Sequence, residues 1–171
     1  MLKALGMIFV IVGTSGVGFS MAISVKRTTA VLQQLLSALE LMKHEISYKK
    51  TPLPELMRIV SLSSKGGVAD FFGRVASDCY QRQEASVYAI VKKSLAETPA
   101  SVFPSNVRQI LLNWGNGLGK YDVTGQLCAI DLANERLRAL LNQYQAEQTS
   151  RMRSYCTLGV CAGLAIAIIL L

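Results

Sequence analysis

Charged residues are scarce in this chain of 171 residues, because Asp, Glu, Lys and Arg together make up 17% of it. Soluble domains usually carry roughly 25%. Apolar residues make up 51%, which excludes an intrinsically disordered chain, since disorder requires low hydrophobicity and high charge. The composition argues against an ordinary soluble globule and favours a folded protein with membrane-spanning segments.

Residues that bind metals or perform catalysis are also few. The single histidine, His44, cannot supply a two-histidine metal site within one chain, and a Ser-His-Asp triad would need it beside an aligned aspartate. No two of the four cysteines form a CxxC pair, so their spacing excludes a zinc or iron–sulfur motif. We therefore expect no metal, no cofactor and no enzymatic activity.

The chain is basic, with 18 Lys and Arg against 11 Asp and Glu, but the positive residues are spread along it. No basic stretch is interleaved with aromatic residues, as a nucleic-acid-binding surface requires. We expect no nucleic-acid partner.

Two long apolar runs lie at the ends of the chain. Residues 4–25 are 22 consecutive uncharged residues, which as a helix reach roughly 33 Å, against about 30 Å for the hydrocarbon core of a bilayer. Residues 154–171 are 18 uncharged residues and reach roughly 27 Å. These runs predict transmembrane helices at 1–25 and 154–171 around a domain at 26–153. Cleavage near Ser20-Met21-Ala22, as in a signal peptide, remains an alternative for the first run.

Small residues recur at helical spacing in both runs. Gly159 and Gly163 form a GxxxG motif that Ala167 extends, and Gly16 and Ser20 form a looser pair. Such faces let helices approach closely in lipid, so we expect helix packing there. The alternative is that glycine is simply common in transmembrane helices.

Positive residues near the predicted membrane ends lie mainly on the side of the middle domain, among them Lys26, Arg27, Arg151 and Arg153. Cytoplasmic loops carry such an excess. We therefore expect a cytoplasmic middle domain, with both termini across the membrane.

The middle domain has helical periodicity and almost no strand alternation. Apolar residues spaced by three and four predict a first helix from about 28 to 48, and Thr51 and Pro52 are suited to the N-cap and first turn of the next. Trp114 is expected in the core, followed by a glycine-rich corner at 115–119. Asp122 or Thr124 would then cap a long last helix. The predicted fold is all-α, an antiparallel bundle of about six helices flanked by the two transmembrane helices.

Several short motifs follow one another over the whole length of the chain. Glu45-Ile46-Ser47-Tyr48 leads to Thr51-Pro52-Leu53, and a Gly115/Gly119-Lys120/Asp122 corner containing Leu118 precedes the long helix. With the two terminal spans, this order resembles the stage III sporulation protein AB family of spore-forming Gram-positive bacteria.

The resemblance implies a fold and a function. The domain would look like the cytoplasmic domain of the inner-membrane platform proteins of type II secretion and type IV pili. The protein would lie in the outer forespore membrane, with the domain in the mother-cell cytoplasm, as a subunit of the channel-like complex that joins mother cell and forespore. Its partners would be the companion ATPase of the same sporulation operon and other membrane subunits, with self-association left open.

The residues at family-like positions are the expected partner-binding residues, with Glu45 and Tyr48 the better candidates if they are exposed. They are Glu45, Tyr48, Thr51, Pro52, Leu53, Gly115, Leu118, Gly119 and Asp122. The alternative function is a pore-lining or receptor-type membrane subunit of an envelope complex. Against it, neither apolar run carries the ionisable residue that a polar pathway normally needs.

The two predicted spans make a first testable prediction. The intact protein should remain in the membrane pellet after carbonate extraction, and a reporter active only in the cytoplasm should be active when fused near residue 100. Release by carbonate would contradict the spans, whereas activity of an exported-only reporter at that position would reverse the orientation.

Overall fold

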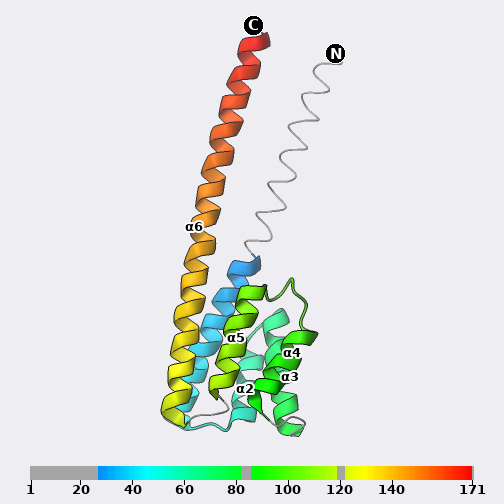
Figure 1. Ribbon diagram of the computed structural model, residues 1–171, viewed down its shortest axis with the longest axis vertical. Helices are drawn as coiled ribbons and strands as arrows, with labels where there is room; N and C mark the ends of the chain where they lie inside the picture. The colour runs from blue at the N-terminus through cyan, green and yellow to red at the C-terminus, as the bar shows by residue number, and fades with distance from the viewer. Residues whose placement is uncertain (1–26, 82–85, 119–121, 171) are drawn as a thin grey trace. The chain divides into compact units, whose positions relative to one another are not determined.

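The structure is a computed structural model that describes residues 27–81, 86–118 and 122–170, with side chains described through residue 146. The described residues form six successive helices and no strand, which confirms the predicted all-α class (Figure 1). They are the helix of residues 27–44, continued by a π-helical turn η1 (Glu45–Lys49), and α2 (Leu53–Ser63), α3 (Gly66–Gln81), α4 (Val87–Glu97), α5 (Ser105–Leu118) and α6 (Val123–Leu170).

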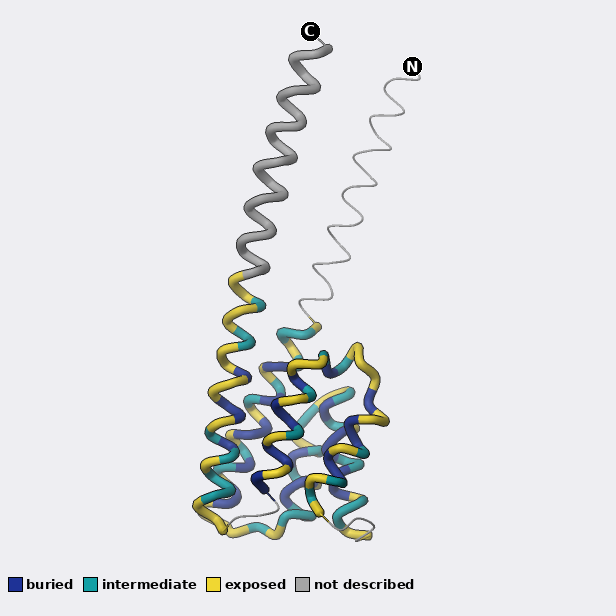
Figure 2. Tube along the Cα trace, in the orientation of Figure 1, coloured by how far each residue is buried: buried dark blue, intermediate teal, exposed yellow. Residues whose placement is uncertain are grey.

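The chain divides into a compact unit, Thr28–Leu141, and a second unit made of Met1–Arg27 with Asn142–Leu171. In the compact unit buried and exposed residues alternate along each helix (Figure 2), and the buried ones are mostly apolar. This amphipathic pattern is the one that the spacing of three and four residues predicts.

Aromatic side chains form the centre of the core. Trp114 is 1% exposed, which confirms its predicted place. The ring of Phe72 packs edge to face against Trp114 with centroids 6.0 Å apart, and Phe71 packs against Phe72 at 5.0 Å and Phe103 at 5.4 Å. Edge-to-face pairs at these separations stabilise a core beyond their buried area, so α3, α5 and the segment before α5 are held together by one aromatic cluster.

The first helix buries the predicted apolar face but ends differently from the prediction. Leu32, Leu39 and Ile46 are buried, whereas the α-helical pattern stops at residue 44 and widens into η1. The turn ends at Lys50, whose φ of 52° is left-handed. One π-helical turn inside or at the end of an α-helix is uncommon and is frequently found at functional sites.

The start of α2 corrects the predicted cap. Thr51 is not the N-cap, since Pro52 holds that position and α2 begins at Leu53. The Pro52 carbonyl accepts the first helical hydrogen bond, from the Leu56 N–H at 2.9 Å. The Thr51 hydroxyl instead donates to Glu45. Pro52 sets the backbone conformation at the start of α2, so the side chain of Thr51 is available for its contact with Glu45.

The predicted glycine-rich corner is wrong for Gly115 and Gly117, which lie inside α5 and are buried. A Cβ on Gly115 would lie 2.9 Å from Val91 Cγ2, and one on Gly117 would lie 2.4 Å from the Cβ of Ala129. These glycines serve close packing of α5 against α4 and α6. α5 continues to Leu118, and Asp122 caps α6, with its carboxylate accepting the Gly125 N–H at 3.0 Å.

The predicted membrane spans stay predictions. No helix long and apolar enough to cross a bilayer is found among the described residues. The first predicted span, with Gly16 and Ser20, lies outside the described residues. Residues 154–170 belong to α6, but Gly159, Gly163 and Ala167 lie beyond residue 146, where the description of side-chain surroundings ends.

The contact between α5 and α6 makes a second prediction. Gly117→Ala should destabilise the fold by about 1–3 kcal/mol, because the added methyl group overlaps a Cβ that is fixed by the backbone of α6. Alanine would otherwise be favoured in a helix by up to about 1 kcal/mol. Thermal unfolding of the full-length protein, followed by circular dichroism, measures the change.

The double variant Gly117→Ala/Ala129→Gly is the matched control. It restores the space at the contact, so it should be more stable than the sum of the two single variants predicts. A Gly117→Ala protein as stable as the wild type would contradict the proposed role of this glycine.

Candidate partner-binding site

Predicted residues of the turn before α2 meet the start of α6, which is about 70 positions later in the sequence, at one end of the bundle. The turn between η1 and α2 packs against the first turn of α6, where the two enclose a shallow pocket of about 230 Å³. Thr51, Pro52 and Leu53 line it from one side, and Val123 and Gln126 from the other. We call this end, with the neighbouring Tyr48 and Lys50, the corner surface.

The buried side chain of Glu45 stabilises the turn that forms the corner surface. Its side chain is buried, with the residue 4% exposed. The carboxylate accepts hydrogen bonds from Lys49 Nζ at 2.7 Å and from Thr51 Oγ1 at 2.9 Å. Both bonds favour the ionised form, and they hold the pKa of Glu45 below its ordinary value of 4.5. The carboxylate thus ties η1 to the segment that enters α2.

Tyr48 is the most exposed large apolar residue of the corner surface. It is 79% exposed, and its ring lies 4.9 Å from that of His44. Val123, across the pocket, is 47% exposed, and Lys50 and Pro52 are exposed as well. Of the two preferred candidates, Tyr48 meets the condition of exposure, whereas Glu45 is an internal residue.

The candidates from the end of α5 have a different role from those of the turn. Gly115 and Leu118 are buried in the bundle, and Gly119 lies outside the described residues. Asp122 is exposed and caps α6. Of the predicted residues, a partner can therefore touch the exposed Tyr48, Pro52 and Asp122 and the half-buried Thr51 and Leu53.

Sequence reasoning missed Lys50 and Val123. Lys50 has a left-handed backbone conformation that is uncommon for a residue other than glycine, and a lysine gives no sequence signal for it. By its sequence alone, Val123 would be assigned to the apolar face of a helix. Its exposure depends on where the turn before α2 lies, which only the packed structure defines.

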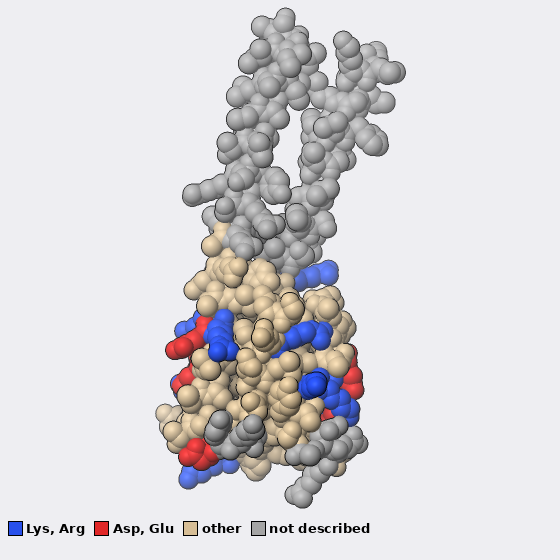
Figure 3. All heavy atoms as spheres, in the orientation of Figure 1, with Lys and Arg blue, Asp and Glu red and all other residues tan. Residues whose placement is uncertain are grey.

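Charge and metal-ligand patterns add no chemistry to this site. Lys and Arg are interspersed with Asp and Glu over the face that Figure 3 shows. Within the described residues, no three His, Cys, Asp or Glu side chains gather in a way that would hold a metal ion. The corner surface offers an exposed aromatic ring, aliphatic groups and a cation, which suit a protein partner.

Known proteins share both the sequence pattern and the fold. A family model described as stage III sporulation protein AB matches residues 3–171. The chain belongs to the stage III sporulation protein AB family. The stage III sporulation protein AB of Bacillus subtilis (strain 168) is 27% identical over 172 residues, and the alignment covers 100% of both chains.

A solved structure of a stage III sporulation protein AB shares the fold. Its TM-score is 0.66 at 22% identity, over 72% of this chain and 98% of the solved chain. Membership of the family supports a role in sporulation, and the family is not known as one of enzymes.

The hydrogen bonds of Glu45 make a third prediction. Thr51→Val removes one donor to the carboxylate, so the pKa of Glu45 should rise towards 4.5. Because the folded pKa is depressed, Glu45 stabilises the fold above its ordinary pKa, and this contribution is lost as the pH falls through the folded pKa. In the variant this contribution should be smaller, and its loss should be complete at a higher pH than in the wild type.

An NMR titration of the side-chain carboxyl carbon of Glu45 measures this pKa. Ser47→Ala, at an exposed position of the same turn, is the control and should leave the pKa of Glu45 unchanged. An equal pKa in the wild type and in Thr51→Val would show that the hydroxyl does not stabilise the carboxylate.

Proposed function

We propose that this protein is a non-enzymatic platform subunit of the membrane complex that connects mother cell and forespore in sporulation, and that its corner surface docks the companion ATPase. The observation that carries the proposal is the convergence of the turn after η1 and the start of α6 into one exposed surface. Family membership supports the sporulation role.

The chemistry of the corner surface suits docking. Exposed aromatic residues are enriched among the residues that contribute most to protein interfaces, and Tyr48 is 79% exposed on a turn whose shape is fixed by buried Glu45. A rigid turn loses little conformational entropy on binding, which favours affinity. Lys50 adds an exposed cation that can pair with an acidic group on the ATPase.

The proposed location follows from the sequence. The two apolar runs would anchor the chain in the outer forespore membrane, and the excess of positive residues beside them favours a domain in the mother-cell cytoplasm. A cytoplasmic ATPase can reach the corner surface only in this orientation. The protein would then act by holding the ATPase at the membrane, together with the other membrane subunits.

Removing the exposed ring makes the fourth prediction. Tyr48→Ala should raise the Kd for the companion ATPase about 30-fold, equivalent to roughly 2 kcal/mol, as is typical of a residue at the centre of an interface. It should also lower the yield of spores. Co-purification of the two full-length proteins and a binding titration in detergent measure the first effect.

Tyr88→Ala is the matched control, because Tyr88 is a 39% exposed tyrosine of α4 away from the corner surface. It should bind the ATPase as the wild type does, and both variants should keep the thermal stability of the wild type. If Tyr48→Ala binds the ATPase as tightly as the wild type, the docking surface lies elsewhere. If both variants lose binding equally, the loss does not assign docking to the corner surface.

A further inference from the structure

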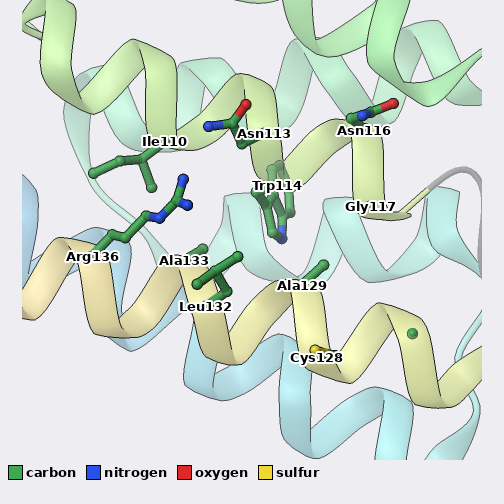
Figure 4. Close-up of a pocket in the computed structure, with 11 residues that line it drawn as sticks. Ile110, Asn113, Trp114, Asn116, Gly117, Cys128, Ala129, Leu132, Ala133 and Arg136 are labelled. Atoms are coloured by element: carbon green, nitrogen blue, oxygen red, sulfur yellow. The ribbon is translucent and has the colours of Figure 1, made fainter.

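A groove separate from the corner surface runs between α5 and α6. Its volume is about 390 Å³, within the range of roughly 300–1,000 Å³ that is usual for ligand pockets. The side chain of Trp114 extends from α5 towards α6, and that of Arg136 extends from α6 towards α5 beside Ile110 (Figure 4). Leu132 lines the same groove and is 46% exposed, so an apolar surface lies open beside a cation.

Arg136 has no ion pair or hydrogen bond among the described side chains. On its own helix, the residues three and four positions away are Leu132, Ala133, Ala139 and Leu140, none of which is acidic. Arg58, Arg74 and Arg138 of the same bundle each meet a carboxylate. Arg136 is exposed, and its positive charge lies at the edge of an apolar groove without a carboxylate partner among the described residues, so an anionic group complements it.

Neutral hydrogen-bonding groups surround the apolar surface. Asn113 and Asn116 line the groove from α5 and are exposed. The indole N–H of Trp114 is buried and has no acceptor in the described structure, which is rare in folded proteins. An occupant that carries several amide groups, apolar side chains and one carboxylate complements the exposed Asn113, Asn116, Leu132 and Arg136, and a peptide is such a molecule.

We propose that the groove between α5 and α6 binds an acidic, apolar peptide segment of a partner protein, with a carboxylate of the segment on Arg136 and an aliphatic side chain against Leu132. This surface is additional to the corner surface and does not depend on the proposed docking of an ATPase. A fatty acid would also present a carboxylate and an apolar chain, but it has no groups for the amides of Asn113 and Asn116. The peptide accounts for more of the lining.

The test selects the ligand by its chemistry. A displayed library of random 12-residue peptides is panned on the full-length protein in nanodiscs of neutral lipid, after depletion on Arg136→Glu nanodiscs. We expect the enriched peptides to combine aliphatic residues with Asp or Glu, and Arg136→Glu to weaken their binding at least tenfold. Trp114 is the only tryptophan of the chain, so binding in the groove should shift the tryptophan emission.

Three variants separate the groove from general charge and folding effects. Lys92→Glu changes the charge by the same amount on α4, outside the groove, and should leave binding unchanged, while Arg136→Lys should retain most of it. If Arg136→Glu fails to fold, Leu132→Gln, at an exposed position, should weaken binding instead.

Four results would overturn the proposal. They are the absence of any enriched peptide, enriched peptides without acidic residues, binding that is insensitive to both groove variants, and oleate that shifts the emission and displaces the peptides regardless of their acidic residues. The last result would assign the groove to a lipid.

Discussion

The close approach of α5 to its neighbours is the constraint on which the rest of the bundle depends. Gly117 leaves room for the Cβ of Ala129, and Gly115 leaves room for Val91, so α5 packs directly against α6 and α4. Trp114, directly before Gly115, joins the aromatic cluster of the core. If either glycine carried a side chain, α6 or α4 would have to shift, because interiors packed at crystal-like density have little space to absorb an added group.

Both proposed surfaces follow from the position that this contact gives to α6. The first turn of α6 meets the turn before α2, which creates the corner surface. Another face of α6, from Gly125 to Arg136, borders the groove with α5. The aliphatic residues Val123 and Leu132 are exposed at these two places. The same helix can thus present two apolar sites to two different partners.

The corner surface also illustrates how a buried charge can shape an exposed site. Glu45 is internal and would be a poor contact residue, yet it accepts hydrogen bonds from Lys49 and Thr51 across the π-helical turn. Such a bond to an ionised group is stronger than one between neutral groups. The turn that it stabilises holds Tyr48 in solvent, so the two residues have complementary roles, one in structure and the other in contact.

The sequence by itself determined the helical class, the apolar face of the first helix and the buried place of Trp114, and it narrowed the cap of α6 to Asp122 or Thr124, because each depends on local spacing or on a side chain next to its own backbone. It was wrong about Thr51 as a cap and about the glycine corner, because glycine has the same sequence signal in a turn and in a close helix contact. Only the tertiary structure decided that Glu45 is buried, that Lys50 adopts a left-handed conformation, and that Arg136 faces a groove without a partner. These features depend on which helices meet, and that is set by packing between residues far apart in the chain.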